Sequence, residues 1–342
     1  MRTKLALHAA LLALLSVGAP LFSADVHVLR PDRAYDFQAV DHQSPVVVTA
    51  LALSPAGDRI AASGDDHCIR LWDIASGAHP VLLKGHDDWV RGLSFDDQGL
   101  RLASAGDDRR LTVWDALTAR PLIENQEAAG PIGSVAFLPG GQQLIAAAYG
   151  DKLRLLNVSS GLIDKQFPCA CTDTRVTGIS PDGRWLAAAG RSGTMRVWSL
   201  AAGGEGRDIP ADFQRIHALA FSPDGKRVAT GGNGNSVRLW DLTTGDLLKE
   251  LPTRPAKVYS LLWLSDSRLA VGGTDNQIHL WDTKAVRCTH RLVGHTGTVA
   301  VLTRDASGKM LASGGFDTTV MTWRVPSESQ GDTAAAGVTQ HR

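Results

Sequence analysis

The chain has 342 residues, of which 44% are hydrophobic, so it is long enough to bury a large core. Its 35 basic and 35 acidic residues balance to a formal charge of zero, and no long run of Lys or Arg occurs. Nucleic-acid binding needs a field that attracts phosphates, so the balance argues against that class, and we expect no nucleic-acid partner.

Residues 1–24 have the pattern of an export signal. Arg2 and Lys4 precede an apolar run over residues 5–17, and small residues follow it. The run of 13 residues is too short to span a bilayer comfortably, which takes about 20 residues. We therefore expect cleavage, export to the periplasm or the outside of the cell, and no membrane span in the mature form. The alternative is an uncleaved N-terminal anchor.

Residues 25–34 are predicted to form a linker, which contains Pro31-Asp32-Arg33 near its end. Residues 35–40 then alternate polar and apolar side chains, as expected for a half-buried strand.

From here to residue 325 the chain repeats itself. A Trp, or one Leu in its place, recurs at steps of 42, 42, 42, 42, 41 and 42 residues. The marked positions are Trp72, Trp114, Leu156, Trp198, Trp240, Trp281 and Trp323. A period of about 40–45 residues with Trp-Asp at the end of a strand is typical of a β-propeller blade. We predict an all-β, seven-bladed propeller over residues 35–325.

Repeat two shows the pattern of one blade most clearly. Strands are predicted at residues 90–95, 100–105, 111–114 and 120–125, with turn residues between them. The last repeat stops after Val325 with no fourth strand. Residues 35–40 should therefore pair into the blade formed by residues 296–325, which closes the ring and removes an open sheet edge.

With these motifs, the chain is identified by resemblance as a member of the WD-repeat family, in an exported, bacterial-type form. The resemblance implies a hydrogen-bonded tetrad in each blade: His, Ser or Thr, Asp and Trp. Two repeats carry complete tetrads, His86, Ser104, Asp108 and Trp114 in repeat two and His295, Ser313, Asp317 and Trp323 in repeat seven. Four other repeats keep parts of it: His42, Asp66 and Trp72 in repeat one, Trp198 in repeat four, Thr230 and Trp240 in repeat five, and Asp275 and Trp281 in repeat six. Repeat three has lost nearly all of it, with Gly150 and Leu156 in those places.

The His-Ser-Asp trio is not interpreted as a hydrolase triad, because it recurs at blade intervals and leads to a Trp instead of an exposed nucleophile. The acid and His groups at residues 65–67 and 86–88 are interpreted as turn and tetrad residues in preference to metal ligands. No phosphate-binding loop, nucleophile elbow or haem-attachment motif occurs. We expect no catalytic residue, no metal, no cofactor and no enzymatic activity.

The resemblance also implies that two positions in each repeat face a partner. Those positions hold Trp89, Tyr149, Arg191, Arg215, Lys257 and Phe316, together with Asp65, Asp107 and Thr274. Exposed aromatic and Arg side chains are the usual material of interface hot spots. We expect a monomeric, non-enzymatic protein–protein interaction scaffold. The alternatives are a propeller enzyme of hydrolase or lactonase type at the central channel, or an accessory subunit of an envelope assembly.

Two further segments carry weaker signals. Cys169-Ala-Cys171 could be a redox pair or half of a metal site, but no second Cys or His cluster has matching spacing, so an ordinary strand or loop pair is favoured. Residues 326–342 have almost no large apolar side chains and are predicted to be disordered.

Overall fold

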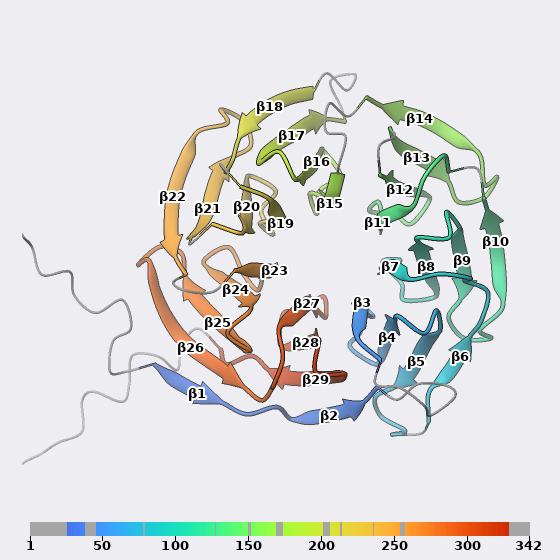
Figure 1. Ribbon diagram of the computed structural model, residues 1–342, viewed down its shortest axis with the longest axis horizontal. Coiled ribbons are helices and arrows are strands. Elements are labelled where there is room, and N and C mark those ends of the chain that lie inside the picture. The colour runs from blue at the N-terminus through green and yellow to red at the C-terminus, as the bar shows by residue number, and fades with distance from the viewer. Residues whose placement is uncertain are drawn as a thin grey trace, which may run out of the picture.

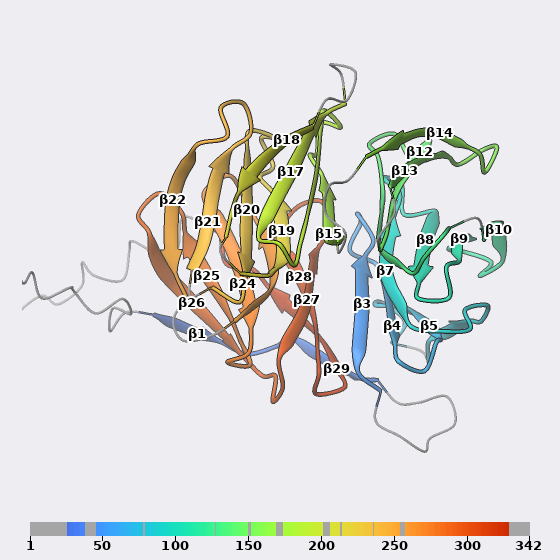
Figure 2. The same cartoon turned by 45° about the horizontal axis from the view of Figure 1, so that its top comes forward.

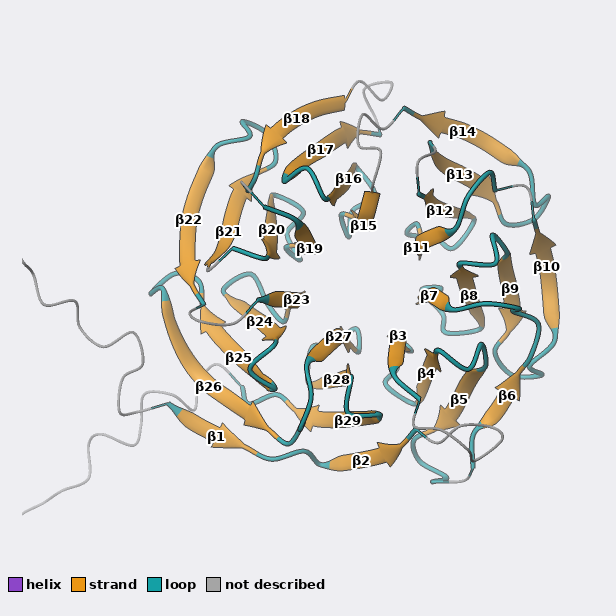
Figure 3. Ribbon diagram, viewed as in Figure 1, coloured by secondary structure: helices purple, strands orange, loops and turns teal. Residues whose placement is uncertain are grey.

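The computed structural model describes residues 26–37, 46–77, 79–126, 128–149, 152–168, 174–200, 206–212, 214–234, 236–253 and 257–327. Over these ranges the chain consists of strands and turns (Figure 3), and no helix in them could cross a membrane. Seven sheets are arranged around a central axis (Figure 1). The prediction of a seven-bladed, all-β propeller is confirmed. The predicted signal, His42, Cys169, Cys171 and the tail beyond Ser327 lie outside the described residues.

Each blade is an antiparallel sheet whose strands follow one another outward from the axis, and Figure 2 shows the blades obliquely. The innermost strands are β3 (Val48–Leu53), β7 (Val90–Phe95), β11 (Ile132–Phe137), β15 (Thr174–Ile179), β19 (Ile216–Phe221), β23 (Val258–Trp263) and β27 (Val299–Arg304). The second strands are β4 (Arg59–Gly64), β8 (Arg101–Gly106), β12 (Gln143–Ala148), β16 (Trp185–Gly190), β20 (Arg227–Gly232), β24 (Arg268–Gly273) and β28 (Met310–Gly315). The third strands are β5 (Ile69–Asp73), β9 (Leu111–Asp115), β13 (Leu153–Asn157), β17 (Thr194–Ser199), β21 (Ser236–Asp241), β25 (Gln277–Asp282) and β29 (Thr319–Arg324). The fourth strands of blades one to six are β6 (Val81–Leu83), β10 (Pro121–Asn125), β14 (Ile163–Phe167), β18 (Gly206–Pro210), β22 (Leu247–Pro252) and β26 (Arg287–Val293).

The fourth strand of blade seven comes from the other end of the chain. Strand β2 (Arg33–Asp36) pairs antiparallel with β29, with Tyr35 opposite Val320. The amide of Phe37 extends this pairing by donating to the carbonyl of Thr318 at 3.1 Å. The predicted closure of the ring by an N-terminal strand is confirmed, although pairing begins two residues before the predicted start. Residues 38–40 of the predicted strand lie outside the described residues.

The linker predicted for residues 25–34 is wrong for its middle part, because strand β1 (His27–Leu29) lies there. It pairs in parallel with the outer edge of β26 and gives blade six a fifth strand (Figure 1). Leu29 packs against the core between blades six and seven. The sequence signal was weak because β1 is only three residues long, and the outer edge of β26 supplies its hydrogen-bonding partner.

The core consists of clusters between neighbouring blades. The second strands are buried on nearly every residue and are rich in Ala, Ser and Gly, since the blades converge there. A Cβ placed on Gly231 would come within 2.7 Å of Val258 Cγ1 in the next blade, so a larger residue there would push the blades apart. Turn glycines adopt the predicted left-handed conformation, as Gly183 does with a φ of 70°.

Blade three forms without the repeated Trp. Leu156 occupies that position, is 5% exposed, and lies opposite Leu144 as Trp114 lies opposite Leu102 in blade two. A buried branched side chain therefore holds the blade where the tetrad is absent.

Candidate functional site

The tetrad of blade two forms a continuous chain of hydrogen bonds. Trp114 Nε1 donates to Ser104 Oγ at 2.8 Å, and Ser104 Oγ lies 2.8 Å from His86 Nε2. His86 Nδ1 lies 2.8 Å from Asp108 Oδ2. Burial lowers the pKa of His86 below its usual value, against the opposing charge of Asp108. A neutral imidazole then donates from Nδ1 to Asp108 and accepts from Ser104. The Trp114, Ser104 and His86 side chains of the tetrad therefore all have hydrogen-bond partners.

Blade seven repeats this geometry. Trp323 Nε1 donates to Ser313 Oγ at 2.8 Å, Ser313 Oγ lies 2.7 Å from His295 Nε2, and His295 Nδ1 lies 2.9 Å from Asp317 Oδ2. Asp317 also accepts from the amide of Thr296 at 2.7 Å. The carboxylate therefore joins the loop before β27 to the turn after β28.

Neither His-Ser-Asp trio is accessible to a substrate. The side chains of His86 and His295 are each 1% exposed, and Ser104 and Ser313 are fully buried. A nucleophile must reach solvent and a substrate carbonyl, whereas each of these hydroxyls is held between an imidazole and an indole. The trios are structural connections between strands and loops.

The incomplete tetrads are arranged differently. Trp240 Nε1 still donates to Thr230 Oγ1 at 2.9 Å in blade five. Asp66 is paired with Arg70, and Asp275 lies 2.6 Å from His279 Nε2 on its own third strand. Within the described part of the chain, Trp281 Nε1 is buried and has no hydrogen-bond partner.

This difference predicts unequal effects of one substitution in two blades. Trp281 and Trp323 are both 1% exposed, so a change to Phe removes a similar volume from each. Trp323→Phe also removes a hydrogen bond, whereas Trp281→Phe removes a donor that has no partner. We expect Trp323→Phe to lower the free energy of unfolding by about 1–2 kcal/mol more than Trp281→Phe, measured by urea titration. Equal losses would contradict the assigned role of the indole N–H.

A β-bulge occurs at the second residue of every innermost strand. In blade two, Val90 pairs with Gly106 and Gly92 with Ala105, which leaves Arg91 without an opposite residue. The same shift leaves out one residue in each of the other blades. The bulged residues are Thr49, Arg91, Gly133, Arg175, His217, Tyr259 and Ala300. Bulges redirect side chains, and here those of Arg91, Arg175 and His217 contact residues that follow second strands, namely Asp107, Tyr149 and Asn233.

Two loop positions flank each bulge. In an antiparallel hairpin the start of the first strand and the end of the second strand lie next to each other at the open end. The backbone joins them: the amide of Asp107 donates to the carbonyl of Trp89, Asn233 to Arg215, Thr274 to Lys257, Phe316 to Thr298 and Tyr149 to Pro131, at 2.8–3.1 Å. We call these loop residues and the bulged residues, with Val47, Asp65 and Arg191, the rim. In blade four the remaining position, Asp173, lies outside the described residues.

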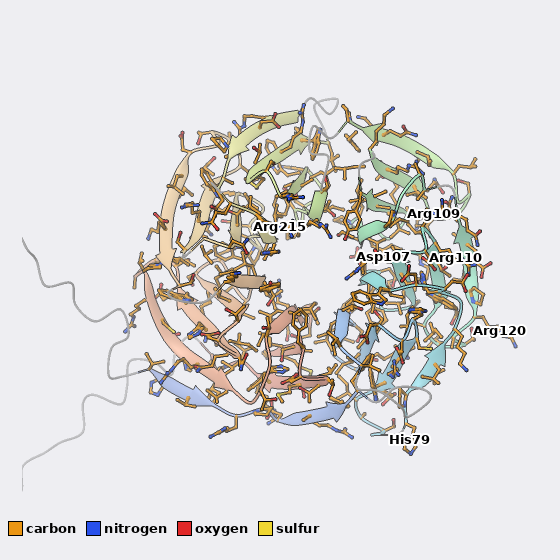
Figure 4. The ribbon with its side chains drawn as sticks, in the orientation of Figure 1. His79, Asp107, Arg109, Arg110, Arg120 and Arg215 are labelled. Atoms are coloured by element: carbon orange, nitrogen blue, oxygen red, sulfur yellow. The ribbon has the colours of Figure 1, made fainter. Side chains whose placement is uncertain are left out.

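The sequence-predicted binding residues all lie on the rim. Trp89 is 39% exposed, and the guanidinium of Arg91 lies 4.4 Å from its ring centroid. Arg91 in turn pairs with Asp107 at 2.6 Å. Arg191 and Lys257 are exposed, and Arg215 is half-buried. Figure 4 places Arg215 and Asp107 on opposite sides of the axis.

One connected group on the rim is a row of rings that crosses three blades. His217 stacks on Tyr259 with centroids 4.6 Å apart and planes 11° apart. Tyr259 meets Phe316 edge to face at 6.1 Å, and Phe316 is 48% exposed. His217 Nε2 is fixed by a 2.9 Å contact with Asn233 Oδ1. We call His217, Tyr259 and Phe316 the aromatic row.

Sequence reasoning identified Phe316 but missed His217, Tyr259 and Asn233. A signal was present, because Arg91, Gly133, Arg175, His217 and Tyr259 stand at successive 42-residue steps. The step marks equivalent positions, but only the bulge shows that these side chains belong with the rim loops.

The comparison with known families agrees with this geometry. The family described as "WD domain, G-beta repeat" matches residues 36–73, 79–115, 165–199, 209–241, 245–282 and 286–324, which together make up more than half of the chain. The chain belongs to the WD-repeat family. This WD-repeat protein has no matched segment between residues 116 and 164, the region that holds most of blade three, including Leu156.

Two relatives share shorter stretches with this WD-repeat protein. It is 41% identical over 78 residues to the probable serine/threonine-protein kinase PkwA of Thermomonospora curvata. The matched stretch covers 22% of this chain and 9% of the kinase. It is 50% identical over 42 residues to the nuclear distribution protein PAC1 of Mycosarcoma maydis. That stretch covers 12% of this chain and 9% of PAC1. The likeness therefore extends over about a tenth of each relative.

Among the residues that the structure describes, no group of three or more His, Cys, Asp or Glu side chains is arranged to hold a metal ion. Residues 65–67 and 86–88 contribute to turns, ion pairs and the tetrad of blade two instead.

Proposed function

We propose that this WD-repeat protein is a non-enzymatic, monomeric scaffold that binds another protein on its rim. The aromatic row is the observation that carries the proposal. Three side chains from blades five, six and seven make one connected surface, and its last member is half exposed. Rigid aromatic side chains surrounded by polar residues are typical of interface hot spots.

The rest of the rim supports this function. The tetrads connect the loop before an innermost strand to the turn after the second strand, so Trp89 and Phe316 are held on a fixed backbone. A rigid surface loses little conformational entropy when a partner binds. Family membership favours the same function, since WD-repeat propellers are usually interaction platforms.

The proposal also includes export, based on the signal pattern of residues 1–24. The partner should therefore be sought in the cell envelope. The test is affinity capture from envelope extract with the tagged protein, its Trp89→Ala/Phe316→Ala variant, and a control variant, Leu117→Ala/Leu162→Ala. Leu117 and Leu162 are 63% and 66% exposed and lie outside the rim, so they match the loss of apolar surface.

We expect one protein to be captured reproducibly by the wild type and the control variant, and to be lost with the rim variant. All three proteins should unfold at similar temperatures, because none of the four side chains is buried. Capture that is unaffected by the rim substitutions would contradict binding at the rim.

A further inference from the structure

Positive charge is concentrated on one side of the rim. Among the described rim residues of blades four to six, four carry a cationic side chain and none carries a carboxylate. These are Arg175, Arg191, Arg215 and Lys257, which we call the cationic arc. Arg175, Arg191 and Lys257 are exposed.

The cationic arc is contiguous with aromatic surface. The Arg175 guanidinium lies 4.6 Å from the centroid of the Tyr149 ring. Arg215 precedes β19 and Lys257 precedes β23, so each lies two residues before a member of the aromatic row, His217 or Tyr259. A ligand on this side of the rim would meet cations and flat apolar surfaces together.

Three of the cationic side chains act on His217. Burial is the main reason that the pKa of His217 lies below its usual value, and Arg215, Lys257 and Arg175 each lower it further. The fields of three cations from three blades therefore overlap at His217. In the loop before β19, Asp212 pairs with Arg238 at 3.0 Å, and its side chain is only 7% exposed.

The opposite side of the rim has a different charge pattern. Asp107 pairs with Arg91 there, and Asp65 accepts a hydrogen bond from the amide of Val47. The whole chain has no net charge. A long polyanion would therefore meet the carboxylates of Asp65 and Asp107 once it extended past the cationic arc.

We propose that the cationic arc and the aromatic row together bind an acidic peptide segment of the partner protein, one in which carboxylates alternate with large apolar side chains. This inference rests on the proposed function and specifies the chemistry of the partner. The carboxylates would pair with the Arg and Lys side chains, and the apolar residues would lie on Tyr259 and Phe316.

The test uses fluorescence anisotropy with the full chain and two short fluorescein-labelled peptides. In one peptide glutamates alternate with apolar residues, and in the other glutamine replaces every glutamate. The arc variant carries Arg175→Gln, Arg215→Gln and Lys257→Gln. The control variant carries Arg120→Gln, Lys226→Gln and Lys309→Gln, three exposed cations away from the rim with the same change in net charge. Figure 4 shows Arg120 on the outside of the ring.

We expect the glutamate peptide to bind the wild type at least about tenfold more tightly than the glutamine peptide, and the arc variant to lose about tenfold in affinity. The control variant should bind like the wild type, and raised salt should weaken the interaction. If the arc variant unfolds, the single Lys257→Glu change, at an exposed position, should still weaken binding measurably.

Equal binding of the two peptides, equal losses in the arc and control variants, or tighter binding of a single-stranded oligonucleotide of similar length would each overturn the inference. The proposed function fails separately, since it depends on partner capture by Trp89 and Phe316. Partner capture that survives the arc substitutions but is lost with the Trp89→Ala/Phe316→Ala variant would leave the scaffold function intact and refute the acidic segment.

Discussion

Replacing Phe37 by Ala is expected to lower the free energy of unfolding by about 3–5 kcal/mol, because this side chain holds the closing segment against blade one. Phe37 is 2% exposed, its ring centroid lies 6.0 Å from that of Trp72, and the Arg70 guanidinium lies 4.3 Å from it. It belongs to the core cluster that joins blades seven and one. Urea unfolding followed by Trp fluorescence measures the change.

The matched control for this substitution is Phe316→Ala on the rim. The residue type is the same, but Phe316 is 48% exposed, so its removal should cost less than about 1 kcal/mol. Similar losses in the two variants would mean that the N-terminal segment contributes little to closure. The comparison also separates stability from binding, because only Phe316→Ala should affect partner capture.

Replacing Asp317 by Ala is expected to destabilise the protein by about 3 kcal/mol at neutral pH. The carboxylate accepts hydrogen bonds from His295, from the amide of Thr296 and from Thr319 Oγ1, and its side chain is 5% exposed. Its removal takes the acceptor away from these three donors, of which the His295 ring is buried. Asp275→Ala is the control, because Asp275 holds the equivalent turn of blade six, is 28% exposed, and should cost no more than about 1 kcal/mol.

The effect of Asp317→Ala should depend on pH. Burial acts to raise the pKa of Asp317. A hydrogen bond and the charge of His295, together with hydrogen bonds from Thr296 and Thr319, nevertheless hold that pKa well below its ordinary value of 3.8. Above that value the carboxylate is ionised in both the folded and the unfolded chain, and its stabilising contribution is complete. As the pH falls below it, the unfolded chain takes up the proton first and the contribution is lost.

The difference in stability between the wild type and Asp317→Ala should therefore stay nearly constant from about pH 7 to about pH 5 and shrink as the pH falls further toward about 3. Urea titrations of both proteins at several pH values measure it. A difference that stays constant or grows on acidification would show that Asp317 is not held ionised by its neighbours.

Several features of the fold were predictable from local sequence because each depends on a repeated pattern. The 42-residue period set the number of blades, and the missing fourth strand after Val325 implied closure by an N-terminal strand. Leu156 could be aligned with the Trp residues by position alone, although it lacks the indole. Strand β1 had no such signal, because three residues form a strand only where another edge receives them.

The sequence by itself determined the blade count, the order of strands and the residue types at each rim position, since periodic burial and turn chemistry are encoded locally. Only the tertiary structure decided which rim side chains meet. His217, Tyr259 and Phe316 are far apart in the chain, and the bulges and the closed ring bring them into one row. Contacts between blades depend on how neighbouring sheets pack around the axis, and no local pattern specifies that packing.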